Sequence, residues 1–530
     1  MGYNIIREFY QKGITMSSLS SQKWFRSLFR RRVQITLLLF FQLVFILYIV
    51  IGGSRISDII SAGLTALSFI AVLLVVRKRE KGAYKLSWVI LMLALPVFGG
   101  LFYIITELQT HRPKFVRLER QALAKSSALM SLPGTARDEA VSGNPDLAPE
   151  IDYLEKSAGY PVYSGTRVTY LTPGEAKLAH LLEELEKAEK YIFLEYFIIQ
   201  GGEMWDEILA VLKRKAAAGV KVRVIYDDFG CFFLLPKDFP AELAKYGIDC
   251  RVFNPFRPLL TVVQNNRDHR KIVSIDGKVA FTGGINLADE YINAIELHGH
   301  WKDASIMLEG KAAWSMTLMF LTMWQVTTGE EEDMEQYYPW KDAPCTVPSD
   351  GFVQPYADTP MDTDNVGEHV YLQLINNAKR YVYITTPYLI IDDSMISALS
   401  LAAKSGVDVR LITPHIWDKR FVHETTRSYY PELISAGVRI YEYSPGFIHS
   451  KTFVSDDRVA TVGTANLDFR SLYMHYECGA RFYGSEAVAK VRDDFLDTLE
   501  KCAEIRGKDC RVSLPERLTQ DLLRLIAPLM

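Results

Sequence analysis

The stretch HRKIVSID, residues 269–276, returns later in the chain as HSKTFVSD, residues 449–456. In each copy a lysine follows the histidine by two residues and an aspartate follows it by seven. One such match is weak, because a chain of 530 residues contains short patterns by chance. Both copies also have a glycine 14 residues and an asparagine 17 residues after the histidine: Gly283, Asn286, Gly463 and Asn466. The shared spacing indicates a duplicated unit.

The same order of strands and helices precedes each copy of the motif. YIFLEYFII, residues 191–199, has the pattern of a buried strand, and a helical stretch leads to a second strand, GVKVRVI, at 219–225. The order returns with YVYITTPYLII at 381–391 and GVDVRLI at 406–412. Strands that alternate with helices predict two α/β units with largely covered sheets.

We therefore expect an α/β fold with two tandem sandwich halves related by a pseudo-twofold axis. The predicted boundaries are 161–330 for the first half, 331–372 for a connector and 373–530 for the second half. The first helix is expected to begin at Pro173, a residue that suits the first helical position. Thr172 and Glu175 have the spacing of a capping box around that position.

The histidines and lysines of the motif suit phosphodiester chemistry. Alternate side chains of a strand share a face, so we expect His269 and Lys271 to point the same way. The same holds for His449 and Lys451. If the halves pair, one cleft contains two imidazoles and two ammonium groups. The lysines can neutralise phosphate oxygens, one histidine can attack phosphorus, and the other can transfer protons. This chemistry requires neither a metal ion nor another cofactor.

The acidic residues allow more than one interpretation. Asp276 precedes Gly277 in a pair typical of hairpin turns, and Asp456 takes the same place in the second copy. A turn or ion-pair role for these two aspartates stands beside a catalytic one. Asp303 in HWKD and Glu477 in HYECG are better candidates for orienting the histidines, because a carboxylate behind an imidazole fixes its tautomer.

Other histidines and the cysteines give weaker signals. His298 and His300 form an H-x-H pair, but no third metal ligand accompanies them. His415 and His423 are expected to line or border the cleft. The six cysteines include no CxxC pair, which argues against a zinc site or a disulfide framework.

The first fifth of the chain is strongly apolar. Three stretches, 33–53, 56–76 and 86–105, each have about 20 residues, enough for a helix to cross a membrane. We predict a membrane domain at 1–106 and a basic juxtamembrane linker at 107–160. The protein is therefore expected to be a multi-pass protein of the cell membrane.

The side of the membrane that the rest of the chain faces stays open. Basic residues at 30–32 and 77–81 are placed in the cytoplasm by the positive-inside rule. Three full crossings would then put the catalytic part outside. The basic residues between 112 and 120 instead favour the cytoplasmic side, which a third segment that enters and returns would allow. An oligomer is compatible with the sequence.

Three runs of sequence carry a resemblance to a known family: NNRDHRKIVSIDGKVAFTGGINLADEY, HWKD and PGFIHSKTFVSDDRVATVGTANLDFRS. They resemble the phospholipase D superfamily and, within it, bacterial cardiolipin synthases. The resemblance implies that one phosphatidylglycerol gives its phosphatidyl group to the enzyme, glycerol leaves, and a second phosphatidylglycerol accepts the group to form cardiolipin. It also implies that His269 is the nucleophile and His449 the acid and base. Asp268 and Lys302 depart from the family, where Asn and Arg are common.

Other functions remain to be weighed against a cardiolipin synthase. The same motifs would serve a phospholipase D hydrolase or a transferase with another acceptor, such as phosphatidylethanolamine. A membrane-tethered nuclease is disfavoured by the net charge of −3 and the long apolar segments, so no nucleic-acid partner is expected. A lipid-binding scaffold without activity would not need two intact motifs.

Overall fold

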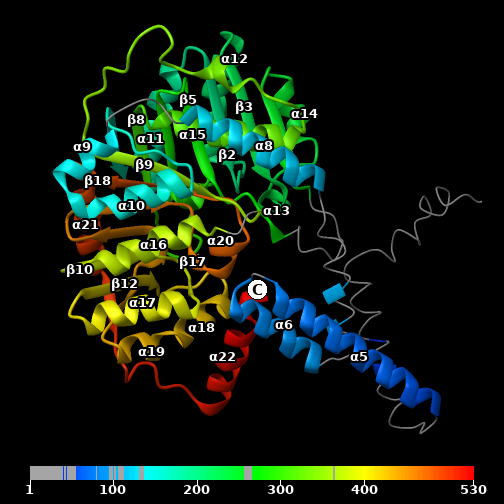
Figure 1. Cartoon of the computed structure of the whole chain (residues 1–530). Coiled ribbons are helices and arrows are strands. Elements are labelled where there is room, and N and C mark those ends of the chain that lie inside the picture. Colours follow the sequence, from blue (N-terminus) through cyan, green and yellow to red (C-terminus); the bar gives the residue numbers. More distant parts are fainter. Residues whose placement is uncertain are drawn as a thin grey trace, which may run out of the picture. The chain divides into compact units, whose positions relative to one another are not determined.

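A computed structural model gives the structure of the chain, which Figure 1 shows as a cartoon. The chain divides into two compact units, Met1–His111 with Phe256–Gln264 and Arg112–Pro255 with Asn265–Met530. The structure describes residues 40, 43–44, 55–78, 80–94, 99–100, 103–104, 113–130, 136–255, 265–361 and 364–529.

The first unit contains two helices that pack together, α5 (Arg55–Arg77) and α6 (Gly82–Ala94). The predicted helix at 56–76 lies within α5, and the one at 86–105 overlaps the end of α6. The stretch at 33–53 lies almost wholly outside the described residues. Among the helices that the structure describes, none combines the length and the apolar character that a membrane crossing needs.

The described residues of the second unit form two large β-sheets and two small ones of two strands each. The first has seven strands in the order β1-β8-β6-β5-β2-β3-β4. Its strands are β1 (Thr166–Leu171), β2 (Tyr191–Tyr196), β3 (Lys221–Asp227), β4 (Asp249–Phe253), β5 (Lys271–Ile275), β6 (Val279–Gly283) and β8 (Ser305–Gly310). The second has eight strands in the order β19-β13-β12-β10-β15-β16-β18-β9. Its strands are β9 (Phe352–Asp358), β10 (Tyr381–Thr385), β12 (Asp408–Pro414), β13 (Arg439–Tyr443), β15 (Thr452–Ser455), β16 (Val459–Gly463), β18 (Glu477–Tyr483) and β19 (Cys502–Ile505).

The two sheets have the same topology apart from β19, which adds an edge to the second. In the first sheet β2, β3 and β4 are parallel neighbours and the other pairs are antiparallel. In the second, β10, β12 and β13 take the parallel places. The predicted α/β fold in two halves is confirmed. The strands predicted at 191–199, 219–225, 381–391 and 406–412 contain or overlap β2, β3, β10 and β12.

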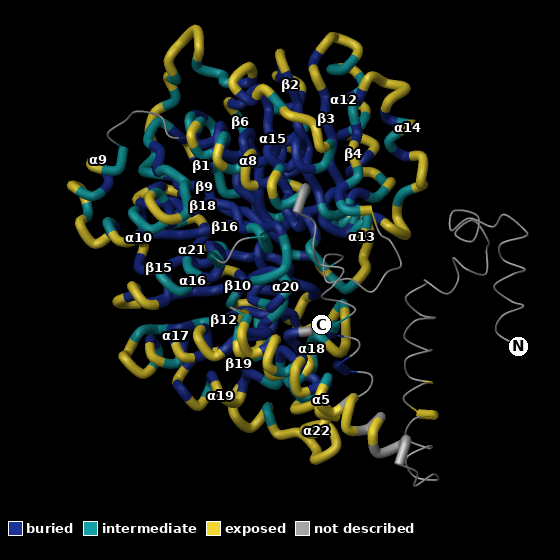
Figure 2. The backbone as a smooth tube through the Cα atoms, turned by 45° about the vertical axis from the view of Figure 1, so that its right-hand side comes forward, coloured by how far each residue is buried: buried dark blue, intermediate teal, exposed yellow. Residues whose placement is uncertain are grey.

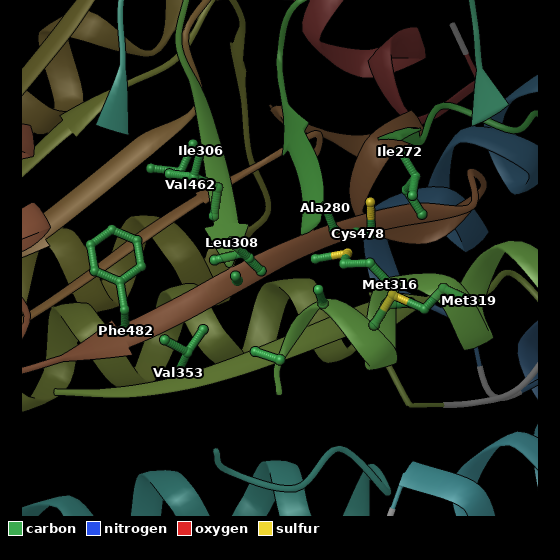
Figure 3. Close-up of a cluster of buried hydrophobic side chains, with 14 of the residues drawn as sticks. Ile272, Ala280, Ile306, Leu308, Met316, Met319, Val353, Val462, Cys478 and Phe482 are labelled. Atoms are coloured by element: carbon green, nitrogen blue, oxygen red, sulfur yellow. The ribbon is translucent and has the colours of Figure 1, made fainter. Parts of the chain in front are cut away.

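A shared core joins the two halves. Ile306 and Leu308 of the first sheet belong to the same buried cluster as Val462 and Phe482 of the second (Figure 3). Helix α15 (Ala313–Thr328) is buried along almost its whole length, because strands of both sheets pack against it. The strands of both sheets are mostly buried (Figure 2). The halves therefore form one body in which loops from each can meet.

Helices α11 (Gly174–Lys187) and α12 (Glu203–Ala217) form a separate core against the other face of the first sheet. The predicted start of the first helix at Pro173 is wrong by one residue, and no side-chain hydrogen bond caps α11. The Thr172 hydroxyl instead donates to the carbonyl oxygen of Asp303 at 3.0 Å. Thr172 is thus held by the loop before β8 and is not available to cap the helix.

The segment predicted as a linker, 107–160, contains α8 (Pro113–Met130), α9 (Ala136–Gly143) and α10 (Ala148–Asp152). Helix α8 packs against α15, and its residues Ala122 and Met130 lie in the shared core. Most of this segment is therefore integrated into the second unit.

Candidate active site

His269 and His449 are positioned by pairing between loops of the two halves. Strand β7 (His300–Lys302) of the first half runs parallel to β14 (Gly446–Ile448) of the second. His449 follows β14 directly, and its backbone N–H donates to the carbonyl oxygen of the last residue of β7 at 2.7 Å. The N–H of His269 donates to the carbonyl oxygen of Tyr476 in the second half at 2.9 Å. Each half therefore fixes the backbone of the other half's histidine.

The shared strand that was expected for each histidine and its lysine is wrong, although the two side chains do lie together. β5 begins at Lys271 and β15 begins after Lys451, which leaves both histidines in the connections before the strands. The Nζ atom of each lysine donates to the carbonyl oxygen of its own histidine. Lys451 Nζ also lies 2.9 Å and 3.0 Å from the two ring nitrogens of His449. Each buried ammonium is thus adjacent to its histidine.

The two carboxylates contact the histidines in a crossed arrangement. Glu477 of the second half lies with Oε1 2.9 Å from Nδ1 of His269 in the first half. Asp303 of the first half lies with Oδ2 2.6 Å from Nδ1 of His449 in the second half. Both acids are buried. Because Nδ1 of each ring faces a carboxylate, Nε2 is the nitrogen left for chemistry, and Nε2 of His449 also has Lys451 Nζ 3.0 Å away.

Shifted pKa values determine which of the imidazoles and carboxylates are charged at neutral pH. Burial lowers the pKa of His269 to about 3, although the adjacent Glu477 opposes this effect. Burial and Lys451 lower the pKa of His449 to about 4. Burial raises the pKa of both carboxyl groups, but the adjacent histidine and lysine together outweigh it, and the pKa of each is lowered. At neutral pH the site therefore contains neutral imidazoles and ionised carboxylates.

The two lysines also have shifted pKa values. Burial lowers the pKa of Lys271 to about 8, partly offset by Glu477 and Asp303. Burial lowers the pKa of Lys451 to about 7, where Asp303 opposes the shift and Lys271 adds to it. A bound anion would stabilise both ammonium groups, because an opposite charge nearby favours the charged form.

The aspartates of the motif lie in hairpin turns at the far ends of β5 and β15. Asp276 and Asp456 have φ values of 51° and 57°, in the left-handed region that turns require. The carboxylate of Asp276 accepts backbone N–H groups of residues 189–191 at 2.7 to 2.8 Å. That of Asp456 accepts those of residues 379–381 at 2.7 to 2.9 Å. These contacts favour a turn role, in which each aspartate ties its hairpin to the neighbouring strand.

The repeated asparagines line the same cavity as the histidines. Asn286 accepts the backbone N–H of Ile198 at 3.1 Å and donates to the hydroxyl of Tyr291 at 2.7 Å. Asn466 donates to Asp468 at 3.0 Å, and its side-chain oxygen is buried with no hydrogen-bond partner among the described residues. That oxygen is available to a ligand.

The repeated glycines are required by close strand packing. A Cβ at Gly283 would lie 2.5 Å from the carbonyl oxygen of Ala304, and one at Gly463 would lie 2.7 Å from that of Cys478. Ala304 follows Asp303 and Cys478 follows Glu477 in the sequence. The glycines therefore let the segments that carry the two carboxylates approach the histidines.

A cavity of about 580 Å³ contains the two histidines and the two asparagines. Most of its exposed lining is apolar and comes from both halves: Phe197, Ile198, Phe229, Tyr291, Trp301, Tyr388, Ile390, Val422, Phe447, Phe469 and Ala527. Charged and polar side chains add to the wall: Arg267, Glu290, Asp418, Lys419, Asp468, Arg470 and His475. Such a lining suits an amphipathic ligand with an anionic group.

His415 and His423 are absent from the described part of the cavity wall, although Val422 lines it, so a place bordering the cleft stays a prediction for both. His300 of the H-x-H pair lies with Nδ1 3.0 Å from the Tyr443 hydroxyl. The sequence interpretation missed His475, which stands two residues before Glu477 as Trp301 stands two residues before Asp303.

The chain matches two protein-family models and resembles a solved structure. A family model described as cardiolipin synthase, PLD-like domain, matches residues 181–306 and 371–499. A second model, described as phospholipase D-nuclease N-terminal, matches residues 66–106. A phosphatidylserine synthase of Haemophilus influenzae has a similar solved structure, with a TM-score of 0.52 and 14% identity, covering 68% of this chain and 93% of that one. The structural likeness supports the fold.

Several bacterial proteins have a higher sequence identity to this chain than that solved structure has. An uncharacterised protein of Streptococcus mutans is 42% identical over 84% of this chain and 96% of its own length. A cardiolipin synthase of Alkalihalophilus pseudofirmus is 35% identical over 84% of this chain and 88% of its own. One from a Geobacillus species is 33% identical over 91% of this chain and 94% of its own.

Proposed function

The chain belongs to the cardiolipin synthase family, and on that premise we propose that it joins two phosphatidylglycerol molecules into cardiolipin and releases glycerol. The observation that carries the proposal is the crossed pair of contacts, Glu477 on His269 and Asp303 on His449, at one cavity. Two imidazoles that both present Nε2 suit a transfer in two steps through a covalent intermediate.

In the first step, Nε2 of His269 attacks the phosphorus of one phosphatidylglycerol. The nitrogen–phosphorus bond forms while the bond from phosphorus to the glycerol oxygen breaks, and His449 gives that oxygen its proton. Glu477 stabilises the positive charge that develops on His269. The order of the two histidines follows the family resemblance.

In the second step, the hydroxyl of another phosphatidylglycerol attacks the same phosphorus. His449 takes the hydroxyl proton, the nitrogen–phosphorus bond breaks, and His269 is regenerated. Asp303 stabilises the protonated form of His449, which exists before the first step and after the second. Protons and bonds balance over the cycle.

The negative charge of the bound substrate changes the protonation of the site. The phosphodiester is an anion, and its approach raises the pKa of His449, Lys271 and Lys451. His449 then carries the proton that the first step needs, and the lysines neutralise charge that develops on the non-bridging oxygens. The apolar wall accommodates the lipid part of the substrate.

Both substrates are lipids, so we also propose that the protein works at the cell membrane. Burial of acyl chains stabilises lipids in a bilayer by about 0.8 kcal/mol per CH₂, which keeps them from reaching a distant enzyme. Exposed apolar side chains of α5, among them Phe69, Leu73 and Val76, are suited to membrane contact in the first unit. Multi-pass insertion is part of this proposal: the segments predicted at 33–53 and 56–76 cross, and 86–105 enters and returns, so that the catalytic unit faces the cytoplasm.

The experiment is a product analysis with the purified full chain in detergent and labelled phosphatidylglycerol. Cardiolipin and free glycerol in equal amounts are expected, with and without a strong chelator. Phosphatidic acid as the sole lipid product would identify a hydrolase, and a mixed product with added phosphatidylethanolamine would identify a different acceptor. Absence of any lipid product would overturn the proposal.

A further inference from the structure

His475 breaks the symmetry of the duplicated site. It precedes Glu477 by two residues, and the corresponding place before Asp303 is taken by Trp301. Both side chains line the cavity. The histidine is thus a feature of one side of the cavity only, the side of His269, whose ring centroid lies 5.6 Å from that of His475.

The ring nitrogens of His475 are buried and still able to form a hydrogen bond with a ligand. The side chain is only 11% exposed, and Nδ1 pairs with Glu477 Oε1 at 3.8 Å, an ionic contact that is longer than a hydrogen bond and that adds to the effect of His269 in lowering the pKa of Glu477. Both ring nitrogens are buried without a hydrogen-bond partner among the described residues. Buried polar atoms are nearly always hydrogen-bonded, because an unpaired one retains the full cost of its desolvation. A side chain in this state beside a cavity points to a bound group that completes it.

The surrounding charge indicates an anion. His269, His475 and Glu477 lie close enough together to hold a divalent cation. However, Nδ1 of His269 already faces Glu477, and the buried ammonium groups of Lys271 and Lys451 would repel a cation. Arg267 and Arg470 line the same cavity. An oxyanion gains from this environment, and an imidazole N–H is a suitable donor to it.

We infer that His475 donates a hydrogen bond to a non-bridging oxygen of the phosphoryl group during its transfer at His269. This inference rests on the proposed function and deepens it. It makes His475 a phosphate-binding residue and makes the His269 side the one that retains the phosphoryl group between the two steps. On the opposite side, the aromatic ring of Trp301 takes the place of the third imidazole.

Tungstate, a phosphate mimic, tests this role without turnover. Calorimetric titration of the full chain in detergent is expected to show about tenfold weaker tungstate binding by His475→Phe than by the parent protein, because one hydrogen bond to a charged group is lost. His475→Gln restores a donor, so its affinity should return to within about threefold. His415→Phe is the control: His415 also lies next to a buried glutamate, with Nδ1 2.9 Å from Glu442 Oε2, but it does not line the described wall of the cavity. Equal melting temperatures would exclude a folding defect.

Kinetics with phosphatidylglycerol separate this inference from the proposed function. His475→Phe should raise KM for phosphatidylglycerol and lower kcat/KM about tenfold, and His475→Gln should reverse most of the loss. Unchanged tungstate affinity in His475→Phe would overturn the inference, even if the parent protein makes cardiolipin. Weaker tungstate binding in His475→Phe supports it, even if no cardiolipin forms. Zinc inhibition that depends on His475, together with unchanged tungstate affinity, would identify a cation site and also overturn it.

Discussion

The two halves contain the same motif in equivalent places, yet the surroundings of the two histidines differ. In the first half, His269 lies beside the rings of Phe197 and His475, with centroids 5.0 and 5.6 Å away. Arg267 and Arg470 line the cavity that both histidines share. The first histidine therefore differs in having a second imidazole beside it, which can bind an oxyanion.

In the second half, His449 lies among aromatic rings. The centroids of Tyr291, Trp301 and Phe447 lie 5.5, 5.7 and 6.0 Å from that of His449. Duplication supplied two equivalent imidazoles with equivalent carboxylates, and later divergence of the surroundings suits them to unequal tasks. In the proposed mechanism, His269 retains the phosphoryl group and His449 transfers protons to and from the oxygens that leave and arrive.

The largest expected loss of turnover follows removal of either histidine, and the covalent adduct distinguishes their roles. His269→Ala and His449→Ala should each lower turnover of phosphatidylglycerol by about 10⁴-fold or more. With a phosphatidyl substrate whose leaving group is nitrophenolate, no proton is needed in the first step. His449→Ala should then accumulate one phosphatidyl group per chain by mass spectrometry, and His269→Ala should not. An adduct on the His269→Ala protein would reverse the assigned roles.

The crossed carboxylates give the next largest effect. Glu477→Gln should lower kcat by about 10³-fold through His269, and Asp303→Asn should do so through His449. With the nitrophenyl substrate, Glu477→Gln should slow formation of the covalent adduct, whereas Asp303→Asn should slow only its breakdown. The reverse pattern, measured by rapid quench, would mean that each carboxylate serves the histidine of its own half.

The repeats made much of this arrangement predictable from sequence. Hydrophobic runs such as 191–199 located the central strands, and a carboxylate near each asparagine drew attention to Asp303 and Glu477. The crossing could not be predicted, because it depends on how β7 pairs with β14 across the two halves. His475 was missed for the same reason: no local pattern shows which side chains from separate loops face one cavity.

A smaller effect is expected from the lysines. The parameter kcat/KM reports the free enzyme, in which burial lowers the pKa of Lys271 to about 8 and that of Lys451 to about 7. With the nitrophenyl substrate, which needs no proton from His449 in the first step, kcat/KM should therefore fall as pH rises through 7 to 8 and beyond, because the ammonium forms exist only below these values. Ordinary lysines would keep their charge to about pH 10. A profile that stays flat from pH 7 to pH 9.5 would contradict the assigned pKa values.

The smallest effect on turnover is expected at the turn aspartates. Asp276→Asn should lower the free energy of unfolding by about 1 to 3 kcal/mol, because an amide cannot accept all three backbone N–H groups as well as a carboxylate does. Asp456→Asn should be milder, since Arg380 donates to both the carbonyl oxygen of Asp456 and the side chain of Asp457 and so braces that turn. Denaturant unfolding measures both changes, and kcat per folded molecule should stay within about twofold of the parent because neither carboxylate touches an imidazole in the structure. A loss of kcat comparable to that of Glu477→Gln, with unchanged stability, would instead give these aspartates a catalytic role.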